Sequence, residues 1–315
     1  MDSIFDVFNI GLFQNTLRTA TPVVLLAMGG LLTEQAGLMN IGMDGMMIIG
    51  CFVAVAFSYW CASASMGLLM AVLFGVLIGL LFALFVVKWK SDEFIIGMAI
   101  NTLGGGLTVY LLRSIFGVKG TFASADIVAL PTLKLEFLKG IPVIGDLLCG
   151  NSLFVYLSWV FVFVVWFFLY RTPYGFWMRA AGEHPESLET AGISPRKMKI
   201  LASVLCGIMC GIAGAHLSLG YLTMFTEGMH NSRGFTAFAC IIFGVANPPK
   251  VFLAALLFGF CEALGLRLQN VGVPSNLAST IPYIATILML VYITISNSNR
   301  KKKLAKKELE NRAQL

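Results

Sequence analysis

Charged residues are scarce in this sequence. Asp, Glu, Lys and Arg make up only 12% of its 315 residues, whereas 58% are hydrophobic. Soluble domains carry about 25% charged residues, so this composition excludes an ordinary soluble protein. Between Gln35 and Val87, Asp44 is the only residue with a formal charge. Apolar runs of about 20 residues are long enough to cross a bilayer as helices, and their lack of strict alternation excludes a transmembrane β-barrel.

The sequence also lacks the motifs of nucleotide hydrolysis and of metal binding. It contains no G-x-x-x-x-G-K-[ST] phosphate-binding loop. Two of its three histidines, His216 and His230, have no partners at metal-ligand spacing. Cys206 and Cys210 share a helix face, where small packing residues are expected rather than a disulfide or a metal pair. The sequence therefore predicts no catalytic residue, no metal and no cofactor.

We predict an all-α integral membrane protein with about nine transmembrane helices, in a domain that covers residues 1–297. Residues 3–17 are amphipathic and too short to span, which predicts an N-terminal interfacial helix. Residues 298–315 form a basic cytoplasmic tail that contributes most of the net charge of +6. The predicted spans cover residues 18–33, 38–60, 64–87, 94–116, 151–170, 198–220, 234–247, 251–267 and 277–296.

Basic residues indicate how these spans are oriented. They gather after the third, fifth, seventh and ninth spans, which lie on one side of the membrane if the spans alternate. The positive-inside rule makes that side cytoplasmic, so we expect a cytoplasmic-membrane protein with a cytoplasmic C-terminus and an outer loop at 117–150. Four spans precede the one at 151–170 and four follow it. Because a single linker span makes the second group of four enter the membrane from the opposite side, this count predicts an inverted 4+4 repeat, a common plan in transporters.

Each half of this plan contains one polar interruption, "TEQAGLMNIGMDG" in the first and "FTEGMHNSRGF" in the second. Irregular backbone at membrane depth is tolerated only inside protein or beside a wet cavity, so the interruptions predict a substrate pathway. The glycines have an equally good explanation as helix-packing contacts. Asp44 is an ionisable residue within a span and is therefore a functional candidate, unless it lies nearer the membrane surface. The predicted pathway residues are Asn40, Asp44 and Asn101, with Glu227 and Arg233 at the outer mouth.

Apart from the tail, the stretch at 174–215 is the only sizeable polar block on the predicted cytoplasmic side. Within the block, "HPESLETAG" is typical of a short helix. Pro185 suits a first turn, Glu186 and Glu189 complement the helix N-terminus, and Gly192 can end the helix. Such a segment either docks on a partner or is a solvated loop.

Three stretches together resemble the permease subunits of bacterial ABC importers in the ribose/branched-chain amino acid superfamily. They are "TEQAGLMNIGMDGMMIIGCFVA", "GEHPESLETAGISPRKMK" and "FTEGMHNSRGFTAFACIIFGVANP". The resemblance runs from about residue 18 to 297. It is strongest to the branch served by basic-membrane-lipoprotein receptors for nucleosides and simple sugars, and there to the shorter of two permeases. Asp44 and Gln35 stand where that family usually has Glu and Arg.

The resemblance implies an ATP-driven importer subunit that works with a separate ABC ATPase, a second homologous permease and an external substrate-binding lipoprotein. It implies a nucleoside substrate, with a simple sugar or a flavin-type vitamin as alternatives. It also implies an ATPase-coupling segment, in which Leu188 and Ile193 would be the apolar anchors. The coupling residues are Glu183, His184, Glu186, Leu188, Glu189, Gly192 and Ile193. Two rival classes stay open: an ion-coupled secondary transporter that uses Asp44, and an intramembrane enzyme.

Overall fold

The structure is a computed structural model that describes residues 10–132 and 150–270, together with scattered residues between 273 and 295. In the described part the regular secondary structure is helical apart from two short strands. The elements are α2 (Ile10–Gln35), α3 (Met43–Cys61), α4 (Ala64–Ala83), the π-helix η1 (Leu84–Lys88), α5 (Glu93–Phe116), β1 (Thr121–Phe122), α7 (Leu153–Arg171), α8 (Pro173–Glu183), α9 (Pro185–Thr190), α10 (Pro195–Ala215), the π-helix η3 (His216–Tyr221), β2 (Phe225–Thr226), α11 (Arg233–Phe243) and α12 (Pro248–Asn270).

Seven helices of the described residues are long and apolar enough to cross a membrane. They correspond to seven of the nine predicted spans, and they confirm an all-α, multi-pass membrane protein. Their bounds are Gly11–Gln35, Met43–Cys61, Ala64–Lys88, Glu93–Phe116, Leu153–Arg171, Pro195–Tyr221 and Pro248–Asn270.

The predicted interfacial helix at 3–17 is wrong in its described part. Residues 10–17 are the first turns of α2, which continues without a break to Gln35; residues 1–9 lie outside the described residues. Polar side chains along the first turns of α2 are satisfied within the helix. Thr16 donates its hydroxyl to the Leu12 carbonyl at 2.9 Å, and Thr19 donates to the Asn15 carbonyl at 2.9 Å. These residues therefore do not need a water-facing surface.

The predicted span at 234–247 is also corrected. The helix there is α11, with 11 residues, which at about 1.5 Å per residue covers roughly half of a hydrocarbon core. Asn231 and Ser232 adopt positive φ angles of 45° and 56°, so the helix cannot extend further towards its N-terminus. The predicted span at 277–296 is described only at scattered positions, and the tail at 298–315 lies outside the described residues.

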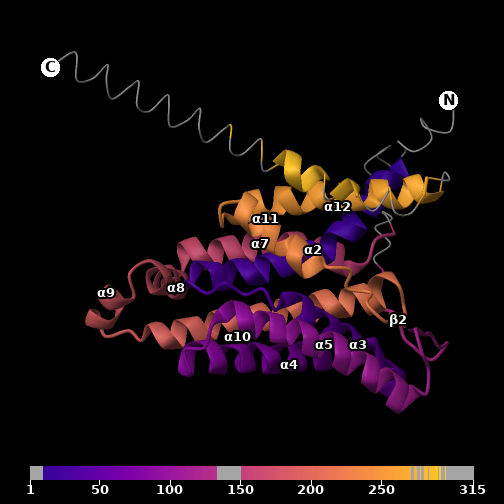
Figure 1. Cartoon of the computed structure of the whole chain (residues 1–315), viewed down its shortest axis with the longest axis horizontal. Helices are drawn as coiled ribbons and strands as arrows, with labels where there is room; N and C mark the ends of the chain where they lie inside the picture. Colours follow the sequence, from indigo (N-terminus) through magenta and orange to yellow (C-terminus); the bar gives the residue numbers. More distant parts are fainter. Residues whose placement is uncertain are drawn as a thin grey trace.

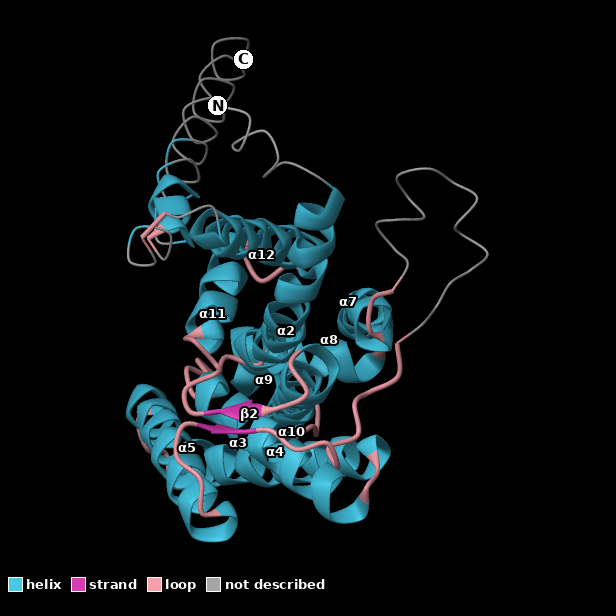
Figure 2. Cartoon of the chain, turned by 90° about the vertical axis from the view of Figure 1, so that its right-hand side faces the viewer, coloured by secondary structure: helices cyan, strands magenta, loops and turns pink. Residues whose placement is uncertain are grey.

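Two pairs of long helices pack through small residues, one pair in each layer of the bundle (Figures 1 and 2). In the lower layer α10 packs on α4, and a Cβ atom built on Gly75 would lie only 2.2 Å from the Gly207 carbonyl oxygen. In the upper layer α12 packs on α2, and a Cβ on Gly259 would lie 2.4 Å from the Ala20 Cβ. The absence of side chains lets the backbones approach closely, as is usual between membrane helices.

The two ends of the bundle carry different structures. The short helices α8 and α9 lie at the left end in Figure 1, and β2 lies at the right end. There β1 and β2 pair antiparallel, with Thr121 opposite Thr226 and Phe122 opposite Phe225. This pairing joins the segment that follows α5 to the segment that follows η3. The predicted coupling segment and the strand that the described part of the predicted outer loop contributes are therefore at opposite ends of the molecule.

Candidate functional site

The first turns of α3 and α11 meet inside the bundle. Gly234, the second residue of α11, donates its backbone N–H to Asp44 Oδ1 at 2.9 Å. A Cβ on Gly234 would lie 2.5 Å from the Asp44 nitrogen, so only glycine permits this approach. Helix N-termini carry unpaired N–H groups and partial positive charge, which a carboxylate stabilises. Asp44 lies in the first turn of its own helix and also caps the other.

Further charged groups extend from Asp44 across the break. The Nε2 atom of His230 lies 3.3 Å from Asp44 Oδ2. Arg233 forms an ion pair with Glu262 of α12 and donates from Nη1 to the Met229 carbonyl at 3.0 Å. Charges in apolar surroundings are costly unless they are paired. The two acids and two bases thus link α3, the loop before α11, and α12 in one polar cluster.

Two asparagines satisfy the backbone of the non-helical segment before α3. Asn101 of α5 accepts the Gly45 N–H at 2.7 Å and donates to the Ile41 carbonyl at 3.0 Å. Asn40 accepts the Gly42 N–H at 3.0 Å. Asn40 is 2% exposed and Asp44 4% exposed. Their polar atoms therefore shape the break, and the predicted role of these residues in the pathway stays a prediction.

The packing explanation for the glycines agrees with the structure. A Cβ on Gly45 would lie 2.3 Å from the Ile100 carbonyl oxygen, and one on Gly50 would lie 3.2 Å from the Gly211 Cα. Gly37 in addition has a φ of +70°, which favours glycine over any residue with a side chain. The glycines thus let α3 approach α5 and α10. The asparagines and Asp44 bond backbone N–H and C=O groups that lack helical partners.

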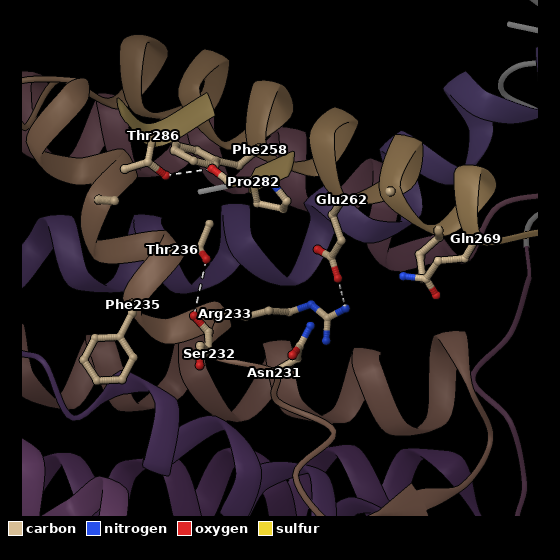
Figure 3. A pocket seen from close by; sticks show the side chains of 13 residues that line it. Asn231, Ser232, Arg233, Phe235, Thr236, Phe258, Glu262, Gln269, Pro282 and Thr286 are labelled. Carbon is tan, nitrogen blue, oxygen red and sulfur yellow. Dashed lines mark hydrogen bonds and ion pairs between the residues drawn. The ribbon is translucent and has the colours of Figure 1, made fainter. Parts of the chain in front are cut away.

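A cavity of about 350 Å³ opens beside the polar cluster, between α11, α12, Pro282 and Thr286 (Figure 3). Its polar lining consists of one ion pair, two amides and three hydroxyls. These residues are Asn231, Ser232, Arg233, Thr236, Glu262, Gln269 and Thr286. This volume and a few convergent polar groups on apolar walls are typical of small-molecule sites.

The two residues predicted at the outer mouth lie in different surroundings. Arg233 lines the cavity and is 9% exposed. Glu227 follows β2, where it accepts the Gly120 N–H at 3.1 Å and pairs with Arg113 at 3.4 Å. Glu227 therefore fastens the strand pair to the end of α5.

Sequence reasoning missed Glu262 and the junction at Gly234. The signal for Glu262 was present, because it is an acid within the apolar run at 251–267, and an ionisable residue in a span is a functional candidate by default. The junction had no comparable signal. A glycine that touches a helix from the other half of the chain looks like any other packing glycine.

The predicted coupling segment contains a short helix, but one of its residues has another role. Leu188 of α9 is 4% exposed and packs against Ala181 and Met198 of the same chain. It therefore holds α9 against α8 and α10, and its predicted role in coupling stays a prediction. Ile193 is partly buried against the same cluster, and Gly192 closes the helix with a φ of +79°. The exposed coupling residues are Glu183, His184, Glu186, Glu189 and Gly192.

His216 and the cysteine pair are packing elements of the described structure. His216 lies in η3, fully enclosed, with its ring centroid 6.0 Å from that of Phe154. The sulfur atoms of Cys206 and Cys210 lie 4.0 Å apart in buried, unbridged side chains. Within residues 10–132 and 150–270, no three His, Cys, Asp or Glu side chains are grouped as metal ligands.

Comparison with known proteins gives one consistent result. The family described as "Branched-chain amino acid transport system / permease component" matches residues 12–291. The guanosine ABC transporter permease protein NupQ of Bacillus subtilis is 32% identical over 87% of this chain and 89% of NupQ. The putative glucose ABC transporter permease protein TsgC13 of Haloferax volcanii is 31% identical over 91% and 93%. The nucleoside ABC transporter permease protein NupC of Lactococcus lactis is 31% identical over 88% and 90%.

Bacillus subtilis and Lactococcus lactis each contain a second permease that also matches, at lower identity. NupP is 25% identical and is covered over 81% of its length. NupB is 23% identical and is covered over 75%. No solved structure gives a significant match to the chain.

Replacing Asn101 by Leu is expected to destabilise the protein. The change leaves the Gly45 N–H and the Ile41 carbonyl without partners, at about 1–3 kcal/mol for each buried polar group. The measurement is the thermal unfolding midpoint of the purified protein in detergent. Thr102→Val is the matched control, because Thr102 is exposed and bonds only the Met98 carbonyl of its own helix. Equal midpoints for the two variants would contradict this role of Asn101.

Proposed function

This chain belongs to the permease-component family of branched-chain amino acid transport systems, and we propose that it is the shorter of two permease subunits of an ABC importer for nucleosides. Membership of the family gives the chain a transport role rather than a catalytic one, with ATP hydrolysed by a separate subunit. It also sets aside the ion-coupled transporter and the intramembrane enzyme. The observation that carries the substrate class is the similarity to NupQ and NupC along nearly the whole length of each.

The second permease is supported by the paired relatives. The chain covers 89% of NupQ but 81% of NupP from the same organism, and 90% of NupC but 75% of NupB. Its length therefore corresponds to the shorter member of each pair. The proposed assembly is therefore a heterodimer of two related permeases, together with two ATPase domains and an external receptor.

A simple sugar is the second candidate substrate, because TsgC13 is as similar to this chain as NupC is. The cavity favours the nucleoside. It combines amide, carboxylate and guanidinium groups with apolar walls that include Phe258 and Leu266. Such walls match the flat face of a nucleobase, whereas a hexose offers hydroxyls in every direction.

We infer that the membrane domain is an inverted repeat of four plus four crossings, with α7 as the linker. The packing between the two halves supports this. In one direction α4 of the first half packs on α10 of the second, and in the other α12 of the second half packs on α2 of the first. The two interrupted segments, one before α3 and one before α11, occupy corresponding places in the two halves. In this scheme residues 222–247 make one crossing, half as loop and half as the short helix α11.

The sidedness follows from the same scheme. The end with α8 and α9 carries Arg171, Arg196 and Lys197 and is proposed as cytoplasmic, which places the chain in the cytoplasmic membrane with its C-terminus inside. The exposed surface of α9 is then available to dock on the ATPase subunit. Because Leu188 ties α9 to α8 and α10, a push on α9 would be transmitted to the long helices.

Replacing Ser187 by Trp on the exposed surface of α9 should uncouple the importer. A bulky ring there would separate the docked surfaces, and a loss of about 1.4 kcal/mol in contact energy already means tenfold weaker association. We expect ATP-dependent uptake and co-purification of the ATPase to fall at least about tenfold. The unfolding midpoint of the permease should not change, because Ser187 is exposed.

Ser187→Ala is the matched control and should behave as the unmodified protein. Normal uptake with a full complement of ATPase in the Ser187→Trp variant would rule out α9 as the docking segment.

The substrate is tested by uptake into proteoliposomes that contain both permeases, the ATPase and the receptor. Radiolabelled guanosine should accumulate in the compartment that the ATPase faces, and only when that compartment contains ATP. Excess unlabelled nucleoside should compete, and glucose should not. Accumulation of glucose without accumulation of nucleosides would replace the proposed substrate by the second candidate.

A further inference from the structure

The cavity beside α11 contains polar groups that the protein itself leaves unused. Arg233 is more than nine-tenths buried, and its Nε atom has no partner among the described residues. Arg233 Nη2 bonds only one oxygen of Glu262, Oε1. In Figure 3 the Arg233 and Glu262 side chains reach toward each other from α11 and α12 across the cavity. Buried polar groups normally have partners, so a guanidinium and a carboxylate that line a cavity with part of their hydrogen-bonding capacity unused point to a ligand.

The Arg233–Glu262 pair presents donors and acceptors side by side. The second Glu262 oxygen can accept hydrogen bonds, while the Arg233 guanidinium can donate them. A nucleobase that has both a ring N–H and a carbonyl oxygen on one edge matches this order. Guanidinium groups bond purine carbonyl oxygens, and carboxylates accept from exocyclic amino groups.

The remaining lining suits the other parts of a nucleoside. Phe258 and Leu266 supply an apolar wall on which a flat base can rest. Asn231 and Gln269 each carry an amide at the cavity, and amides both donate to and accept from sugar hydroxyls. The cavity therefore contains one charged pair for the base edge and separate amides for the ribose.

We propose that this cavity is a transient binding site for a 6-oxopurine nucleoside, in which Glu262 accepts from the base's ring N–H and amino groups and Arg233 donates to its carbonyl oxygen. The inference rests on the proposed nucleoside importer and adds the site and the base class. Binding is expected to be weak, because the base must compete with the existing ion pair. A transported molecule must also be able to leave its sites again.

Glu262→Gln tests the proposal through the ratio of two substrates. Guanosine presents a ring N–H and an amino group to Glu262, whereas inosine presents the ring N–H alone. Glutamine has one acceptor oxygen, and its amino group would face the amino group of guanosine. Guanosine uptake by the reconstituted complex should therefore fall about tenfold more than inosine uptake.

Cys261→Ala, on the neighbouring position of α12, is the control and should leave the guanosine-to-inosine ratio unchanged. An equal fall for both nucleosides in Glu262→Gln would mean that Glu262 only supports Arg233, and would overturn the proposal. If the unmodified complex imports no nucleoside, the proposed function fails instead. If it imports both and the ratio in Glu262→Gln stays the same, the function stands and the site is wrong.

A second variant covers the case in which Glu262→Gln does not assemble. Ala239 lines the cavity and is not a member of the ion pair, and Ala239→Leu would fill part of the space. Uptake of both nucleosides should then fall at least about tenfold, since overpacked sites exclude their ligands. Unchanged uptake in this variant, with the complex assembled, would also overturn the proposal.

Discussion

The hydrogen bond from the Gly234 backbone to the Asp44 carboxylate is the interaction on which the rest of this structure depends. It joins the beginnings of two helices that come from different halves of the chain. The N-terminus of each helix lies inside the bundle, and its first N–H groups have no partners within the helix. Lipid cannot satisfy these groups. The buried carboxylate accepts one of these groups, the Gly234 N–H, and the positive ends of the two helices in turn compensate its charge.

Several features follow from this junction. Gly234 must lack a side chain, because a Cβ would collide with Asp44. Asn40 and Asn101 must bond the backbone of the segment before α3, because that segment has no helical partners of its own. Arg233, the first residue of α11, is brought beside α12, where Glu262 pairs with it.

The sequence predicted the membrane class, the seven long spans and the two interruptions, since all of these depend on composition and on polar residues in apolar runs. It did not predict that α2 begins by Ile10, because Thr16 looks water-facing until its bond to the Leu12 carbonyl is known. The shortness of α11 arises from the strained backbone at Asn231 and Ser232, which no periodicity indicates. The burial of Leu188 depends on Ala181 and Met198, partners that come from other helices.

Thiol labelling at the junction tests the central claim that the two broken segments border the nucleoside pathway. Asn231→Cys is introduced into a complex whose seven native cysteines have been replaced, and Leu253→Cys, 65% exposed on the apolar helix α12, is the comparison site. A hydrophilic thiol reagent should modify position 231 but not position 253, and guanosine should slow the reaction. The claim would be contradicted if position 231 resisted the hydrophilic reagent in every nucleotide state while a lipid-soluble reagent modified both positions.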